Sequence, residues 1–396
     1  MGGASPVKDL TRRPRDRGLQ IALNARELFT AHGYHSVRMD QIAEASGITA
    51  RALYRHYANK QALLSHVIRE DQQRLVAALE QLAAADSPGS VDERLSTLAE
   101  VGLDSRRLSV LWQREARHLT RDDFSLVRNR TRWIAEQVRL LVVAPATPDL
   151  DDFARDVRSW SVVSILTSPA FYNSGLSRAK LKKVLVEACQ RVIVVAGSSH
   201  PDSGVQPVSH PRTPASRREQ LLTAAARAFQ RNGYAGTSID DIGAEVGVVG
   251  PAIYRYFDTK AAILVAVTNR FYEWQALEVA RALPRPARDA DVFDALVEGY
   301  VELAVRAIDL LAVSLTESHY LPEDERDRFD RIREENTLEW QRWISATRDD
   351  LDDATSLTLV HISKGIIHDL VRIAHLYREP TFASELKTAV RAVVHG

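Results

Sequence analysis

The sequence is short of several residue types, and each shortage excludes a class of protein. Its 396 residues include a single cysteine, Cys189, and aromatic residues make up only 7%. One cysteine can form neither an internal disulfide nor a thiolate metal cage. No apolar run is long enough to span a membrane, and no apolar segment follows the basic residues near the N-terminus. We therefore expect a cytoplasmic protein that does not enter a membrane.

Net charge is also lacking, because 52 Lys and Arg residues balance 52 Asp and Glu residues. A neutral chain at first speaks against a nucleic-acid partner, since phosphate binding requires positive charge. The balance is not uniform along the chain. Residues 1–200 contain 29 basic and 22 acidic residues, whereas residues 201–396 contain 23 and 30, so the halves carry +7 and −7. The charge must therefore be interpreted half by half.

What the sequence does contain is an internal repeat with an offset of 200 residues. Residues 33–64 and 233–264 align without a gap, and 11 of 32 positions are identical. The identical positions include the pairs Gly33/Gly233, Gly47/Gly247, Tyr54/Tyr254 and Lys60/Lys260. Chance similarity explains gap-free identity at turn glycines poorly, and the period is too long for a solenoid repeat. The repeat therefore indicates a duplicated domain.

A segment between the two copies separates the chain into domains. Residues 197–216 are rich in Ser, Pro and Gly and contain little that a core could bury, as is typical of an exposed linker. At roughly 100–200 residues per domain, the chain length allows two to four domains. We predict a first domain at 1–198, a linker at 199–209 and a second domain at 210–396.

Apolar residues recur with a helical period through most of the chain, and no clear alternating pattern typical of a strand appears. The helical patterns lie at 17–31, 59–84, 122–143, 150–170 and 178–195, and then at 218–231, 259–283, 289–307, 323–347, 351–377 and 381–394. Prolines fall at the boundaries between these segments. The sequence therefore predicts an all-α fold.

Each copy of the repeat predicts two short helices joined by a tight turn, at about 38–57 and 238–257. In the first copy Gly47 can adopt the positive φ that the turn requires, and Thr49 is a suitable N-cap for the second helix. A helix-turn-helix places its second helix in the major groove of DNA. The exposed residues of that helix that could face bases or phosphates are Thr49, Ala50, Arg51 and Arg55. The alternative is that the two arginines only solvate a surface helix.

The residues after the second short helix are also repeated. Tyr54-Arg55-His56-Tyr57 and Tyr254-Arg255-Tyr256-Phe257 are each followed, three residues later, by a lysine. A tyrosine hydroxyl and the lysines Lys60 and Lys260 can reach phosphates, where they would position the protein without reading sequence. Asn59 and Thr259 are suitable N-caps for a long following helix. Tyr57 and Phe257 are expected in the core.

At these residues the chain resembles the TetR family of transcriptional regulators. The resemblance rests on Gly33-Tyr34, Asp40-Gln41-Ile42-Ala43, Gly47-Ile48-Thr49, Leu53-Tyr54-Arg55-His56-Tyr57, Lys60 and Leu63-Leu64, with their copy 200 residues later. The tandem arrangement is similar to that of repressors of mammalian-cell-entry (mce) lipid-transport operons. Segments 48–57 and 110–117 carry this closer likeness.

The resemblance implies two tandem TetR-like domains, each with a DNA-binding head and a helical body for ligand binding and dimerisation. With the repeated arginines of the second short helix included, the candidate DNA contacts are Arg38, Thr49, Arg51, Tyr54, Arg55, His56 and Lys60 in the first head, and Ser238, Tyr254, Arg255, Tyr256 and Lys260 in the second. The second head departs from the pattern, because Val249 replaces a hydroxyl residue and Pro251 replaces Arg51. We therefore predict that the heads read different half-sites.

Local charge also ranks the two heads. Residues 12–60 contain nine basic and four acidic residues, a net charge of +5, and residues 212–260 contain seven and five, a net charge of +2. The basic residues before the first predicted helix could form an arm that reaches phosphates or the minor groove, or could be a solvated tail. These residues are Arg12, Arg13, Arg15 and Arg17. The first head is therefore expected to bind DNA more strongly.

The helical bodies contain aromatic residues, which in this pattern belong more often to a core than to a pocket. The candidate pocket residues are Trp112, Arg114, Trp133, Trp160, Tyr320, Trp340 and His361. His361, His368 and His375 recur every seven residues, a spacing that does not suit a metal site. Arg114-Glu115 and Glu317 lie in equivalent segments, where a buried charge pair would mark a pocket.

A ligand-responsive DNA-binding repressor explains these features best, with a DNA operator and a small-molecule effector as partners and with neither cofactor nor metal. The resemblance implies a lipid-like or acyl-CoA-like effector and control of lipid-transport or lipid-metabolism genes. The last two helices of each half could pack as a four-helix bundle, so that the chain forms its own pseudo-dimer and holds its heads about one DNA turn apart.

Two alternatives remain open at this point. One is a regulator with a vestigial head that acts through protein contacts. The other is an all-helical enzyme, although the sequence shows no nucleotide-binding loop, no Ser/His/Asp arrangement and no metal-ligand spacing. The sequence does not determine the effector, the operator, the direction of regulation or whether two chains form a homodimer.

Overall fold

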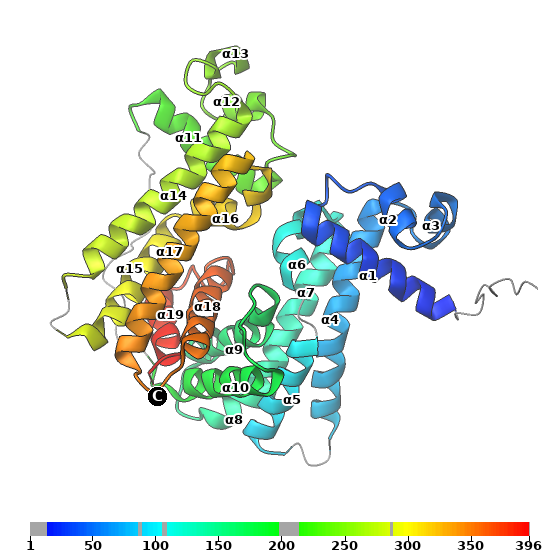
Figure 1. Ribbon diagram of the computed structural model, residues 1–396. Helices are drawn as coiled ribbons and strands as arrows, with labels where there is room; N and C mark the ends of the chain where they lie inside the picture. Colours follow the sequence, from blue (N-terminus) through cyan, green and yellow to red (C-terminus); the bar gives the residue numbers. More distant parts are fainter. Residues whose placement is uncertain (1–13, 86–88, 105–108, 198–213, 286–287, 396) are drawn as a thin grey trace, which may run out of the picture.

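The fold is known from a computed structural model, which describes residues 14–85, 89–104, 109–197, 214–285 and 288–395. Within these ranges the chain forms helices and turns and no strand, so the predicted all-α class is confirmed. The predicted linker at 199–209 lies outside the described residues. Figure 1 shows two helical halves side by side, each with a cluster of short helices at its far end.

The first half begins with three helices that form a head and continues into a body of longer helices. In the described residues these helices are α1 (Pro14–His32), α2 (Met39–Ala45), α3 (Ala50–His56), α4 (Lys60–Ala84), α5 (Val91–Asp104), α6 (Ser109–Glu115), α7 (Arg121–Val138), α8 (Ala144–Ala146), α9 (Asp152–Thr167) and α10 (Arg178–Val194). A π-helical turn, Arg139–Val143, continues α7, which explains why the sequence pattern extended to residue 143.

The second half repeats this order. Its helices are α11 (Arg217–Asn232), α12 (Ile239–Glu245), α13 (Gly250–Ile253), α14 (Lys260–Ala282), α15 (Val292–Arg306), α16 (Ile308–Thr316), α17 (Glu323–Thr347), α18 (Asp353–Leu370) and α19 (Phe382–Ala392). The single helix predicted at 351–377 is too long, because α18 ends at Leu370 and turns follow it. Helices α5 and α6 in the first half and α16 in the second were not predicted.

The two halves are joined by the last helices of each. Helix α9 packs against α10, α18 and α19, and α10 and α18 also pack against α19, so these four helices form a bundle across the halves. At its centre the Arg158 guanidinium donates to the Glu385 carboxylate of the other half at 2.8 Å, and both side chains are almost fully buried. The bundle fixes the two bodies as one unit.

The hydrophobic interior is divided unequally. One core cluster runs from the first body through the bundle into the whole second half, including residues of the second head such as Leu222 and Phe229. The first head has a separate core, built on residues such as Phe29, Ile42 and Leu64, with Leu111 and Val127 from the body. The core of the second head is therefore continuous with the molecule's main core, whereas the core of the first head is separate from it. Within the described ranges no helix is both long and apolar enough to cross a membrane.

Candidate nucleic-acid interface and the adjoining cavity

The first head is a helix-turn-helix whose turns follow from its sequence. Gly47 has a φ of +63° between α2 and α3, where a residue with a Cβ atom would be strained. The Thr49 hydroxyl then accepts a hydrogen bond from the Ala52 amide at 3.2 Å, as predicted for an N-cap. Ile42 and Leu53 are fully buried, so α2 and α3 are held against the head core with their other faces in solvent.

The outer face of α3 carries most of the candidate DNA contacts of the first head. Thr49, Arg51, Tyr54, Arg55 and His56 are all exposed, and Tyr54 retains 52% of its accessible surface. Arg38 is exposed at the start of α2. Among the described residues, no carboxylate lies within ion-pair distance of the three arginines on this face. Their guanidinium groups are therefore available to phosphates or guanine bases.

Lys60 and Lys260 differ from the other candidates because their ammonium groups point into the heads. The Lys60 amine donates to the carbonyl oxygens of Tyr34 at 2.7 Å and Val37 at 2.8 Å, and lies over the Tyr34 ring. Lys260 makes the equivalent bonds to Tyr234 and Thr237, both at 2.9 Å. These lysines hold the turn before α2 or α12 against the long helix α4 or α14. The structure therefore gives them a structural role that their sequence position did not suggest.

The second head keeps the layout but has a different reading surface. Its recognition helix α13 is shorter than α3, and Val249 at its N-cap makes no capping bond and is 74% exposed. Tyr254, Arg255 and Tyr256 are exposed, as their counterparts are. The Ser238 hydroxyl accepts from the Asp241 amide at 3.1 Å and so caps α12. The recognition surface of the second head is therefore more apolar than that of the first and lies on a shorter helix.

Several arginines of the second head are neutralised by its own acids. Arg231 forms an ion pair with Glu245, and Glu219 forms ion pairs with both Arg218 and Arg270. These pairs reduce the positive charge that the head can offer to phosphates. The predicted basic arm of the first head cannot be compared, because Arg12 and Arg13 lie outside the described residues and no side chain is described for Arg15.

A cavity of about 700 Å³ lies in the first half, between the separate core of the first head and the main core. Ile68, Trp112 and Phe124 form its wall on the head side, and Ile134 and Trp160 on the body side. Helix α16 and the turns after α18, both from the second half, complete the wall with residues such as Ala312 and Tyr377. Of the predicted pocket residues, Trp112, Arg114 and Trp160 line this cavity.

Four predicted pocket residues do not line the cavity. Trp133 is on the exposed side of α7, Trp340 is buried in the packed core of the second half, and Tyr320 lies against Tyr234. His361 stacks on Tyr172 with a ring separation of 4.5 Å. An amphipathic pattern shows that a residue lies near an interior but not whether that interior is packed or hollow, which is why the sequence did not separate these four residues from those that line the cavity.

The equivalent region of the second half has a polar cluster where the first half has part of its apolar cavity wall. In the first half Leu75, Ile134 and Val163 line the cavity. Aligning the N-caps of the corresponding helices places Gln275, Asn336 and Lys364 at the same positions. There the Asn336 side-chain oxygen accepts from Lys364 at 2.7 Å and from Gln275 at 3.1 Å. Burial lowers the pKa of Lys364 to about 7. Sequence analysis missed this cluster, although a lysine within the apolar stripe of α18 was a visible sign.

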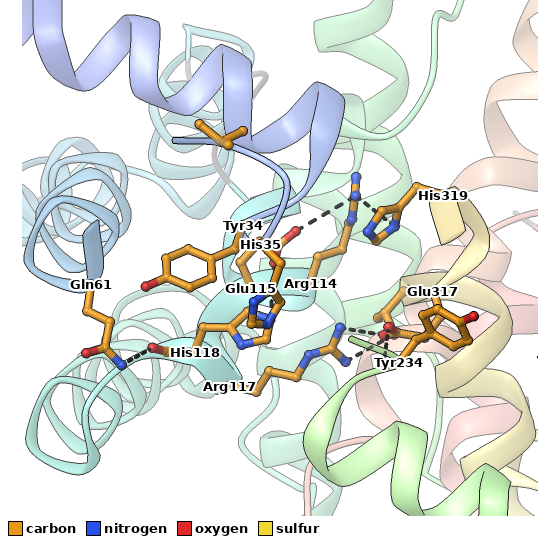
Figure 2. A network of polar contacts seen from close by, with 12 residues as sticks. Tyr34, His35, Gln61, Arg114, Glu115, Arg117, His118, Tyr234, Glu317 and His319 are labelled. Atoms are coloured by element: carbon orange, nitrogen blue, oxygen red, sulfur yellow. Dashed lines mark hydrogen bonds and ion pairs between the residues drawn. The ribbon is translucent and has the colours of Figure 1, made fainter. Parts of the chain in front are cut away.

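A polar network joins the halves beside the cavity (Figure 2). Arg117 of the first half forms an ion pair with the fully buried Glu317 of the second, and Glu317 accepts from the Tyr234 amide at 2.8 Å. Arg114 donates to the Thr30 carbonyl at 3.1 Å and lies 3.3 Å from Nδ1 of His319. Burial and the neighbouring Arg114 lower the pKa of His319 to about 4, so the ring is neutral and accepts this bond. The charge pair predicted around Arg114-Glu115 and Glu317 is therefore Arg117–Glu317.

A buried carboxyl group in the cavity wall makes stability depend on pH. Asp71 of α4 is 7% exposed, and Arg26 of α1 lies 3.8 Å away. Burial outweighs this arginine and raises the pKa of Asp71 from 3.8 to about 8. Between these values the folded state holds a proton that the unfolded state releases, so this group makes stability fall as pH rises.

We expect Asp71→Asn to remove this dependence, because asparagine resembles the protonated carboxyl. The variant should be more stable than the parent at pH 8 and should lose that advantage towards pH 4, with a difference that changes by at most about 1.4 kcal/mol per pH unit. Urea unfolding of both proteins across this range measures the difference. Parallel curves would show that Asp71 is ionised in the folded protein.

Comparison with known proteins agrees with this geometry. The family model for bacterial regulatory proteins of the tetR family matches residues 21–67 and again residues 221–267. The transcriptional activator FasR of Mycolicibacterium smegmatis is 37% identical over 71 residues, which are 18% of this chain and 32% of FasR. The repressor KstR2 of the same organism is 34% identical over 64 residues, 16% of this chain and 31% of KstR2.

A solved TetR-family regulator from Bordetella parapertussis aligns with a TM-score of 0.43 and 23% identity, over 46% of this chain and 96% of that one. The two segments that the family model matches, 21–67 and 221–267, lie in the two heads. The described part of the chain is thus all-α, and each of its two heads contains a segment similar to bacterial regulatory proteins of the tetR family. It spans about a third of the length of the curated relatives it matches.

Proposed function

We propose that the chain is a transcriptional regulator whose two unlike heads bind one asymmetric DNA operator. The observation that carries this proposal is the pair of helix-turn-helix heads with exposed recognition faces on one rigid double body. The bundle of α9, α10, α18 and α19 makes the chain its own pseudo-dimer. Unlike a homodimer, such a chain need not read a palindrome, because its two heads differ in sequence.

The first head is proposed as the dominant reader. Arg38, Arg51 and Arg55 are exposed, whereas arginines of the second head are paired with Glu219 and Glu245. The contacts proposed for the second head are Tyr254, Arg255 and Tyr256, with Val249 offering an apolar contact such as a thymine methyl group accepts. If the second head were vestigial, its half-site would make no difference to affinity.

The cavity is proposed as the effector site of a ligand-responsive repressor, acting on genes of lipid transport or metabolism as in the mce-type repressors that the sequence resembles. Binding would shift the population of head arrangements and so lower operator affinity. Proteins named as activators and as repressors both occur among the relatives, so the direction of regulation rests on the mce likeness. This function is regulatory and not enzymatic.

Fluorescence anisotropy with DNA from upstream of the protein's own gene tests the proposal. We expect affinity to fall steeply with salt, because bound phosphates release counterions. Arg51→Ala should cost about 1–3 kcal/mol and relax sequence preference in the first half-site, and Arg255→Ala should cost less. Arg178→Ala, which removes an exposed arginine of the first body, is the matched control and should bind normally. Absence of binding at low salt would refute the proposal.

A further inference from the structure

Two arginines belong both to the cavity wall and to the joint between the halves. Arg114 lies in the last turn of α6, and Arg117 lies in the 3-10 turn that follows. Both line the cavity, and their side chains are 19% and 18% exposed. A charge at this depth interacts more strongly with an ion than one on the surface, because water screens it less. The partners of these two arginines therefore decide how strongly the cavity can hold an anion.

The positive charge of this pair is only partly compensated. Arg114 is bonded to a carbonyl oxygen and a neutral histidine ring, and its nearest carboxylate, Glu115, lies 3.8 Å away. Burial raises the pKa of Glu115. Arg117 has one carboxylate partner, Glu317, and its buried Nε has no hydrogen-bond partner among the described residues. Among the described residues only the Glu317 carboxylate is within hydrogen-bond distance of either guanidinium group, because Glu115 comes no closer than 3.8 Å to Arg114. The two buried cations are therefore incompletely hydrogen bonded to carboxylates.

The rest of the cavity is mostly apolar. Leu75, Trp112, Phe124, Ile134 and Trp160 form much of its wall. A ligand that fills this space needs an apolar body, and a ligand that satisfies the two arginines needs an acid group. The corresponding positions of the second half hold the hydrogen-bonded Gln275, Asn336 and Lys364 and offer no comparable apolar wall. The first half is thus the better ligand site.

The same arginines take part in a reciprocal contact between the halves. A Cβ atom on Gly233 would lie 2.9 Å from Nε of Arg117, so this arginine of the first half packs on the turn of the second head. A Cβ atom on Gly33 would lie 2.7 Å from Nε2 of His319, so this histidine of the second half packs on the turn of the first head. Gly33 and Gly233 are equivalent in the repeat. Each head is therefore held by the opposite half.

We propose that the cavity binds an amphipathic anion, and that its acid group draws Arg114 and Arg117 away from His319 and Glu317, which releases the two heads from this joint. The proposal rests on the regulatory function argued above and adds the ligand class and the contact that responds to it. The first head can move because its hydrophobic core is separate from the main core. Because the ligand and Glu317 compete for Arg117, weakening the Arg117–Glu317 ion pair must strengthen ligand binding.

Binding of cis-parinarate, a fluorescent fatty acid, tests the ligand class without any DNA. We expect parinarate to bind and its methyl ester, which lacks the charge, to bind at least about tenfold more weakly. Arg114→Gln and Arg117→Gln should weaken parinarate binding by a similar factor and leave the affinity for the ester unchanged. Glu317→Gln keeps an oxygen that can accept from the Tyr234 amide, and it should increase the affinity for parinarate by about threefold. Glu100→Gln, in a surface ion pair of the first body, is the control and should have no effect.

Distance between the heads tests the release. Cys189 is buried, so cysteines introduced at the exposed equivalent positions Glu44 and Ala244 would carry the only spin labels. Parinarate should broaden or shift the distance distribution, and Glu317→Gln should do so without ligand. The ligand assignment would be overturned if acid and ester bound equally or if neither bound. It would also be overturned if binding were lost only in Arg128→Gln and Arg132→Gln, at the cavity rim. An unchanged distance at saturation would overturn the release. None of these outcomes depends on DNA binding, so they are independent of the test of the proposed function.

Discussion

Glu385→Ala is expected to destabilise the protein by about 3–5 kcal/mol, the cost of leaving a buried charge without its partner. Arg158 of α9 has no exposed surface, and its guanidinium donates to Glu385 and to the carbonyl oxygens of Ala154 and Val195. Val195 is the C-cap of α10, so the cation also lies at the negative end of a helix dipole. Without Glu385 the carbonyl groups remain, but no carboxylate of the second half neutralises the arginine.

Urea unfolding followed by circular dichroism measures the effect. Glu187→Ala, which removes an acid of α10 that lies 3.7 Å from Lys183 in an exposed pair, is the control and should cost less than about 1 kcal/mol. The double variant Arg158→Met with Glu385→Leu should recover most of the stability, since apolar replacement of a buried pair is often neutral. A loss in Glu385→Ala no larger than in the control would show that the pair does not hold the halves together.

Gly102→Ala is expected to cost about 3 kcal/mol although it adds a single methyl group. A Cβ atom at this position of α5 would lie 2.3 Å from the carbonyl oxygen of Leu166 in α9. No side-chain rotation relieves a clash with backbone, so the two helices must move apart beside the cavity. The gain in helix propensity, about 1 kcal/mol, is too small to compensate.

The second half offers a matched control for this substitution. Gly299 lies in α15, the counterpart of α5, and a Cβ atom there would be no closer than 3.4 Å to the side chain of Glu278. Gly299→Ala should therefore be neutral or stabilising by up to about 1 kcal/mol. Thermal unfolding of both variants distinguishes the positions. Equal effects would mean that α5 and α9 cross less closely than the structure shows.

Roles that depend on neighbouring residues were predictable from the sequence, whereas roles that depend on distant residues were not. The capping residues Thr49, Asn59 and Thr259 act where predicted, because an N-cap depends on a few neighbouring residues. Lys60 and Lys260 were expected to face phosphates but bind carbonyl groups more than 20 residues earlier in the chain. A long flexible side chain can reach many partners, so sequence position alone does not choose among them.

The sequence by itself determined the all-α fold, the duplicated helix-turn-helix and the difference between the two heads. These features depend on local patterns, namely helical periodicity, turn glycines and caps, which recur at an offset of 200 residues. Only the tertiary structure decided that a cavity lies beside the first head and that Gln275, Asn336 and Lys364 form a hydrogen-bonded cluster at the equivalent positions of the second half. It also decided that Arg117 and His319 cross between the halves. Such contacts join residues about 200 positions apart, and their energies depend on packing and burial that no local pattern specifies.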